Sequence, residues 1–107
     1  MKYSECNARQ KKAYENIYYA ANWIIGGLEN TLMDNAPESD EYKTADSRLS
    51  DHDGLAAELY DAATTEIYTD GGCFFGDAAE RALRDIRFCG KEWLMERVHA
   101  RLRKMGY

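Results

Sequence analysis

The sequence predicts an all-α fold: a small helical bundle of four to five helices, with a long first helix, in one domain of residues 1–107. Three observations support this fold class. Apolar residues recur at steps of three and four along most of the chain, which is the period of a helix. Valine occurs once, and no window alternates β-branched and polar residues as a strand does. The length suits one domain and leaves little room for two.

The composition narrows the class of protein further. Hydrophobic residues make up 45% and charged residues 31% of the chain, which is too apolar for intrinsic disorder and too charged for a membrane span. Three widely spaced cysteines, Cys6, Cys73 and Cys89, are an odd number that argues against a disulfide framework. The N-terminus lacks the pattern of a signal peptide. We therefore expect a cytoplasmic protein that contacts no membrane and carries no cofactor.

The first predicted helix covers residues 7–33. Asn7, with a glutamine three residues later, resembles a capping box, and Pro37 biases the residue before it away from helix. A helix of this length spans ~40 Å, whereas a compact globule of this size is only ~34 Å across, so the helix must protrude or bend. Gly26-Gly27 is the expected bend, or else a point of close approach by another helix. The apolar stripe consists of Tyr14, Ile17, Tyr18, Ala21, Ile24, Ile25, Leu28 and Leu32.

Two further helices are expected in residues 39–69, one over 39–49 and one over 53–69. Ser50 and Asp53 have the spacing of a helix start, and Gly54 weakens any continuous helix at that point. A single kinked helix is the alternative, because apolar positions from 42 to 63 also keep a heptad repeat.

The last third of the chain predicts two more helices. Asp70-Gly71-Gly72 ends the preceding helix, and a short turn follows in which we expect Phe74 and Phe75 to enter the core. Asp77, with a glutamate three residues later, is the expected N-cap of the next helix.

That helix is expected to end at Cys89-Gly90, and the final helix covers residues 91–104. A minimal hairpin of residues 67–69 and 73–75 is a further possibility, although arms of three residues are marginal.

Charge is arranged in blocks along the chain, within an overall net charge of −5. Residues 1–12 carry a net charge of +3, residues 13–80 carry −13, and residues 81–107 carry +5. One interpretation is internal, with the basic ends lying against the acidic middle and cancelling its self-repulsion. The other is a polarised surface that steers a charged partner.

The basic third block does not have the properties of a nucleic-acid reader. A helix-turn-helix with Gly90 in its turn would place Glu96 where the second helix needs an apolar residue. The overall pI near 5.0 also argues against general nucleic-acid binding. We therefore do not expect direct contact with nucleic acid.

Paired carboxylates at helical spacing suggest an alternative chemistry. An E-x-x-E pair is followed after sixteen residues by an E-x-x-D pair, and four carboxylates together can hold Mg²⁺. This pattern resembles that of the all-α nucleotide pyrophosphatases of the MazG type, over about a quarter of the chain. The resemblance implies a Mg²⁺-dependent pyrophosphatase. Its metal ligands would be Glu38, Glu41, Glu58 and Asp61.

The leading hypothesis is a non-enzymatic interaction protein without a metal site. Tyr19 and Trp23 flank the main stripe of the first helix and suggest a second aromatic face, of the kind found at interfaces. The acidic segment suggests a partner that is a basic nucleic-acid-binding protein, which this chain would inhibit. A structural homo-oligomer built on the first helix is a further alternative. The predicted partner-binding residues are Asp34, Glu38, Asp40, Glu41, Asp46, Asp51, Asp53, Tyr19 and Trp23.

Overall fold

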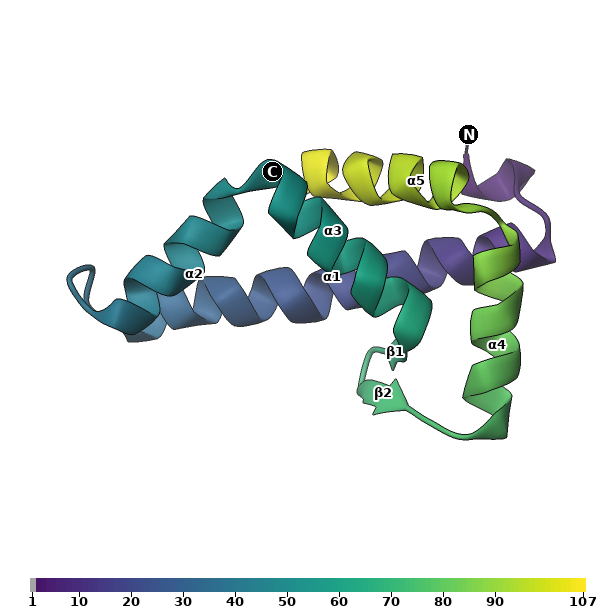
Figure 1. The fold of residues 1–107 in the computed structure, drawn as a ribbon, viewed down its shortest axis with the longest axis horizontal. Helices are drawn as coiled ribbons and strands as arrows, with labels where there is room; N and C mark the ends of the chain where they lie inside the picture. The colour runs from purple at the N-terminus through teal and green to yellow at the C-terminus, as the bar shows by residue number, and fades with distance from the viewer. Residues whose placement is uncertain (1) are drawn as a thin grey trace.

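The computed structural model describes residues 2–107 and has the predicted all-α architecture (Figure 1). Within these residues, five α-helices are joined by a single small hairpin at the edge of the molecule, and α1 follows the longest of the three axes of 46 × 29 × 20 Å. In chain order the elements are a 3-10 turn (Tyr3–Glu5), α1 (Ala8–Asp34), α2 (Asp40–Ser50), α3 (His52–Thr65), β1 (Ile67–Thr69), β2 (Gly72–Phe74), α4 (Asp77–Phe88) and α5 (Lys91–Lys104).

The helix α1 begins with the predicted capping box and is uninterrupted to its end. The Gln10 amide donates to Asn7 Oδ1 at 2.8 Å, and the Asn7 amide donates to Gln10 Oε1 at 2.9 Å. The C-terminal part of α1 protrudes, together with α2, beyond the other helices (Figure 1). A Cβ atom at Gly26 or Gly27 would meet nothing within 4 Å. The predicted close approach of a second helix at these glycines is therefore wrong.

The buried face of α1 is rotated from the predicted stripe. Tyr18 is 41% exposed and Tyr14 and Ile24 are half-buried, because the small alanines, not the tyrosines, face the neighbouring elements. Small side chains let α3, α4 and β1 come close to α1, whereas the tyrosine rings lie at the edge of the contact. The buried residues of α1 are Ala13, Asn16, Ile17, Ala20, Ala21, Ile25 and Leu28.

Residues 39–65 form two helices, so the single kinked helix is wrong. Ser39 caps α2 by accepting from the Tyr42 amide at 3.2 Å. Asp51 has extended backbone angles and caps α3 by accepting from the Gly54 amide at 3.0 Å. A side chain that caps a helix satisfies an amide that has no partner within the helix. The start of α3 therefore lies at Asp51.

The helix α3 ends at Thr65, four residues before the predicted end. Glu66 is extended, and the next residues form the hairpin that the sequence suggested only as an alternative. Its strands are antiparallel, with Ile67 opposite Phe74 and Thr69 opposite Gly72.

Two expectations for residues 74–77 are also wrong. Phe74, the last residue of β2, and Phe75, which follows it, are 42% and 75% exposed, because the hairpin lies at the edge of the molecule (Figure 1). Asp77 is the first residue of α4 and not its N-cap. That place belongs to Gly76, whose φ of 105° suits glycine.

A buried asparagine fixes the point where α3 gives way to the hairpin. Asn16 on α1 is only 3% exposed. Its Nδ2 donates to the carbonyl oxygens of Ala63 at 2.7 Å and Glu66 at 2.9 Å, and its Oδ1 accepts from the Tyr68 amide at 2.7 Å. These backbone groups lie beyond the reach of helical pairing, and buried polar groups need partners. Asn16 therefore holds the end of α3 and the start of β1 against α1.

One hydrophobic core joins the five helices and extends to β1. Its largest fully buried side chains are Ile17, Ile25, Leu55, Leu59, Ile86, Leu94 and Val98. Among residues 2–107, no helix has both the length and the apolar character that crossing a membrane requires.

Candidate interaction surfaces

Seven of the predicted partner-binding residues are carboxylates, and the structure leaves all seven exposed. They extend from the end of α1, through the connection of residues 35–39 and along α2, to the start of α3. We call this set the acidic surface. Its members are Asp34, Glu38, Asp40, Glu41, Asp46, Asp51 and Asp53.

Part of the acidic surface has a local structural role. Asp40 and Glu41 lie in the first turn of α2, and Asp53 lies in the first turn of α3, where negative charge is favourable next to the positive end of the helix dipole. Asp51 is the N-cap of α3. Asp34, Glu38 and Asp46 have no such role, so helix capping explains only some of the charge on this surface.

Among residues 2–107, no salt bridge includes a carboxylate of the acidic surface. Arg48 pairs with Glu58, within the same acidic segment. At the basic ends of the chain, Arg9 and Lys12 both pair with Asp85, at 3.5 and 3.1 Å. Within residues 2–107, no salt bridge joins the acidic surface to a basic residue from either end of the chain. Arg87 of the basic third block does pair with Glu80 of the acidic middle, at 3.8 Å, so the internal interpretation holds at that point and stays a prediction for the acidic surface.

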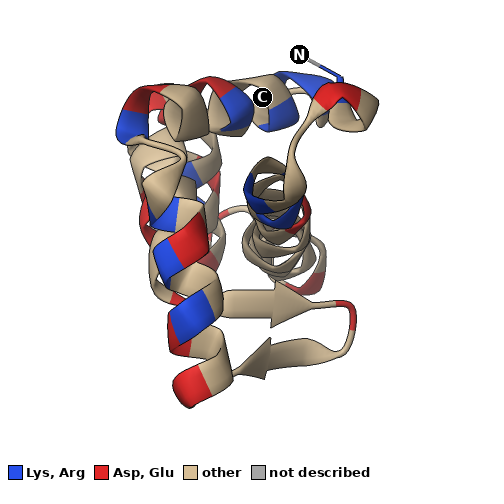
Figure 2. Cartoon of the chain, turned by 90° about the vertical axis from the view of Figure 1, so that its right-hand side faces the viewer, with Lys and Arg blue, Asp and Glu red and all other residues tan. Residues whose placement is uncertain are grey.

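Lys and Arg gather in the other half of the molecule, where they are mixed with acidic residues. Figure 2 shows blue segments on α4, on α5 and at the start of α1, with red segments interspersed on α4 and α5. The Lys12–Asp85 pair lowers the pKa of Asp85 through its hydrogen bond and charge, and Arg9 adds to the effect. The two halves therefore differ: the basic half carries internal ion pairs and the acidic surface does not.

The four carboxylates of the alternative metal site do not form a metal-binding cluster. Glu38 lies in the connection before α2, and Glu41 lies in the first turn of α2. Glu58 on α3 is occupied by Arg48, and Asp61 is exposed. Within residues 2–107, no group of three or more Asp, Glu, His or Cys side chains is arranged to hold a metal ion. The resemblance to the pyrophosphatases thus receives no geometric support.

Tyr19 and Trp23 lie on the other side of α1 from the acidic surface. The Trp23 indole is 49% exposed and its Nε1 donates to the Thr69 carbonyl oxygen at 2.9 Å, so Trp23 lies on the side of the hairpin. The helix α2 packs on the opposite side of α1 (Figure 1). On the hairpin side of α1, a shallow groove is lined by Tyr19, Asn22, Trp23, Gly26, Gly27, Asn30 and Asp70. The acidic and aromatic residues therefore form two surfaces, not one.

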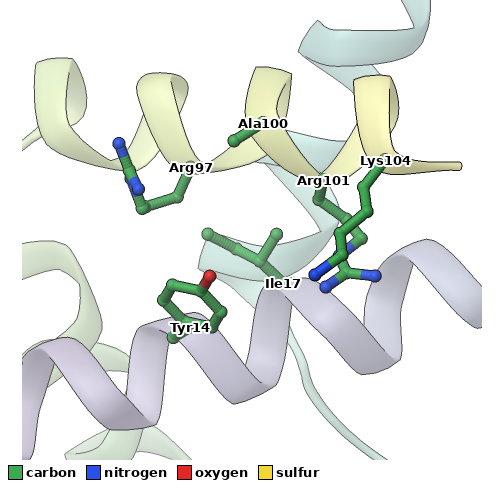
Figure 3. Close-up of a pocket in the computed structure, with 6 residues that line it drawn as sticks. All are labelled: Tyr14, Ile17, Arg97, Ala100, Arg101 and Lys104. Carbon is green, nitrogen blue, oxygen red and sulfur yellow. The ribbon is translucent and has the colours of Figure 1, made fainter. Parts of the chain in front are cut away.

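Sequence analysis missed a third feature, a cleft between α1 and α5 (Figure 3). Three of its lining residues are cations that stand four and three residues apart on α5, and that spacing is the signal that could have identified them. Figure 3 shows Arg101 and Lys104 reaching from α5 towards α1. The six lining residues are Tyr14, Ile17, Arg97, Ala100, Arg101 and Lys104.

Comparison of the chain with protein-family models, curated proteins and solved structures finds no match. Any functional inference therefore depends on the acidic surface, the groove beside Trp23 and the cleft between α1 and α5.

Proposed function

We propose that this chain is a non-enzymatic interaction protein whose acidic surface binds a basic macromolecular partner. The observation that carries the proposal is the separation of charge. Residues 34–61 hold nine carboxylates against Lys43 and Arg48, and Arg48 is already paired with Glu58. Among residues 2–107, no salt bridge includes any of the seven exposed carboxylates, and like charges on one segment repel one another. A basic partner would relieve this repulsion.

The partner that fits this surface best is the nucleic-acid-binding face of another protein. Such a face presents Lys and Arg to a row of phosphates, and closely spaced carboxylates along α2 offer a comparable array of negative charge. The chain would then act as an inhibitor by occupying that face. This part of the proposal rests on size and charge, since fold alone does not define function.

The cytoplasm is the compartment that we propose. Cys6, Cys73 and Cys89 are all free, and cysteines remain reduced most readily in a reducing compartment. Cys73 is exposed, so an oxidising environment would leave it open to disulfide formation between chains.

A competition experiment tests the proposed function. Tagged protein is incubated with lysate, captured proteins are identified, and the complex is reconstituted from purified components. We expect a captured protein that binds nucleic acid, duplex DNA or RNA that competes for it, and an affinity that falls steeply between about 50 and about 300 mM salt. A complex that is indifferent to salt and to nucleic acid would overturn the proposal.

A matched pair of variants assigns the binding to the acidic surface. Asp40→Asn with Glu41→Gln removes two carboxylates from the first turn of α2, and we expect the dissociation constant to rise about tenfold. Asp77→Asn with Glu92→Gln removes two carboxylates from the first turns of α4 and α5. This control makes the same change in net charge and should alter the affinity by less than about twofold. Equal effects would remove the acidic surface from the proposal.

A further inference from the structure

We propose that the groove beside Trp23 binds a neutral pyranose ring of a carbohydrate. The volume of the groove is about 320 Å³, which lies within the range of small-molecule sites. All but one of its lining residues come from one face of α1, and Asp70 comes from the turn between β1 and β2. The groove lies on the other side of α1 from the acidic surface, so this inference goes beyond the proposed function and does not rest on it.

The two adjacent glycines of the groove have no role in packing. Glycine is the least favourable residue in a helix interior after proline, yet α1 continues through Gly26 and Gly27. A Cβ atom at either position would meet nothing within 4 Å, so no neighbouring element requires the absence of a side chain. Both glycines line the groove, and larger side chains there would occupy it. They therefore keep this face of α1 open to a ligand.

The Trp23 ring is held in place and is half exposed. Its Nε1 donates to the Thr69 carbonyl oxygen at 2.9 Å, and 49% of the residue is exposed. The single polar atom of the indole is thereby satisfied within the protein, so a ligand meets the apolar ring. An aromatic face carries partial negative charge, which attracts the polarised C–H groups on the flat face of a pyranose. Because the ring is fixed before binding, little ordering is needed when the sugar arrives.

Polar side chains beside this ring are available to sugar hydroxyls. Asn22, Asn30 and Asp70 line the groove. Among residues 2–107, none of these three side chains forms a hydrogen bond or a salt bridge with another residue. An amide side chain both donates and accepts, and a carboxylate accepts. Sugar hydroxyls also both donate and accept, so the three side chains match the edge of a pyranose ring.

The charge of the groove favours a neutral ligand. Asp70 is the one charged residue among the seven that line it, so the lining offers no cation to a phosphate or an acidic sugar. A nucleobase also stacks on aromatic rings, but it has two apolar faces, and a shallow groove would leave one of them in water. A quaternary ammonium can bind an aromatic face, but it would give the two amides no hydrogen-bonding partner.

Titration of the isotope-labelled protein with neutral saccharides tests this site. The probes are methyl β-glucoside, methyl β-galactoside and cellobiose, and adenosine and choline represent the competing ligand classes. We expect at least one saccharide to shift the indole resonance of Trp23 with a dissociation constant on the order of 1 mM, and adenosine and choline to bind more weakly. Absence of saccharide binding, or tighter binding of adenosine or choline, would overturn the proposal.

A variant that fills the groove separates binding from folding. Gly26→Leu introduces a good helix former where a Cβ atom meets no neighbour, so the melting temperature should stay the same or rise. Saccharide binding should nevertheless weaken at least about tenfold, because the new side chain occupies the groove. The control Ala57→Leu introduces the same side chain at an exposed position of α3 and should change the affinity less than about twofold. Equal affinities in the two variants would contradict the proposal.

Two further substitutions separate stacking from hydrogen bonding. Trp23→Ala removes the ring and should weaken saccharide binding about tenfold. Phe75→Ala removes an exposed ring outside the groove and should leave the affinity unchanged. Asp70→Asn keeps the shape of the side chain but removes a charged acceptor, and should weaken binding about fivefold. Full affinity in the Trp23 variant, or an equal loss in the Phe75 variant, would exclude the groove as the binding site.

Discussion

The helix α2 and the junction between α3 and β1 both rest on α1, but their polar side chains are used in opposite ways. Only Ala45 and Leu49 of α2 are buried, and its carboxylates face solvent. At the junction, the buried Asn16 supplies hydrogen bonds to three backbone groups. The carboxylates of α2 are thus exposed to solvent, whereas Asn16 is committed to the fold.

This difference indicates which region of the molecule should tolerate substitutions. Free energies of local opening vary across a protein, and elements with few buried apolar contacts open first. With two buried side chains, α2 is expected to open more readily than the junction. The junction belongs to the more stable part, because opening it would leave buried backbone groups without partners.

The largest expected loss of stability comes from a substitution that disrupts the junction between α3 and β1. Asn16→Leu keeps the volume of the side chain similar but removes three hydrogen bonds, and leaves two carbonyls and one amide buried without partners. We expect a loss of about 4 kcal/mol in the free energy of unfolding, measured by urea denaturation. The control Asn22→Leu changes an exposed asparagine of the same helix and should cost less than about 0.5 kcal/mol. Similar costs for both would remove the structural role of Asn16.

The next effect loosens α2 alone. Leu49→Ala removes one of its two buried side chains and should cost about 2–3 kcal/mol, the lower part of the range for such changes, because Leu49 lies at the edge of the core. Hydrogen exchange should accelerate in α2 while the amides of the junction stay protected. Lys43→Ala, an exposed change on the same helix, is the control. Acceleration spread evenly over the protein would show that the two regions do not open separately.

A smaller effect is the dependence of the free energy of unfolding on pH, through Tyr68 at the junction. Burial, followed by the neighbouring Glu66 carboxylate, raises the pKa of Tyr68 to about 12, whereas an unfolded tyrosine ionises near 10. The stability that Tyr68 contributes is therefore complete below about pH 10 and is lost as the pH rises from about 10 to about 12. Phenolate absorbance and urea melts across this range measure both quantities. Tyr68→Phe should lose less stability over the same interval, and an equal loss would contradict the assignment.

The smallest effect concerns the charges of α2. The first-turn carboxylates Asp40 and Glu41 favour the helix dipole by a few tenths of a kcal/mol each, but their mutual repulsion opposes this gain. We expect Asp40→Asn with Glu41→Gln to change the free energy of unfolding by less than about 0.5 kcal/mol. Urea denaturation at low and high salt provides the measurement. A loss above about 1 kcal/mol would mean that these carboxylates serve the fold more than a partner.

Much of the fold could be predicted because helix signals are local. The capping box at Asn7 and the final helix of residues 91–104 depend on neighbours along the chain, and both are present in the structure. The end of α3 could not be predicted, because a residue far away in sequence, Asn16, sets it. A polar residue one position before Ile17 of the apolar stripe was the only hint.

The surfaces were predictable to a different degree. Exposure of the acidic residues follows from composition, since carboxylates are rarely buried. Whether the basic ends would neutralise them depends on tertiary arrangement, which the order of charges along the chain does not determine. The α1–α5 cleft was missed for the same reason. Arg97, Arg101 and Lys104 form one face of a helix, but Tyr14 and Ile17 come from the opposite end of the chain.

The adjacent glycines of α1 have a mechanical consequence. Gly26 and Gly27 meet no neighbour that a side chain would disturb, yet each weakens a helix by ~1 kcal/mol relative to alanine. The two glycines lie between the part of α1 that packs against α4 and α5 and the part that packs against α2. Intrinsic helix propensity is therefore lowest at this point of α1, and the buried side chains of Ile25 and Leu28 on either side must hold the two glycines in the helix.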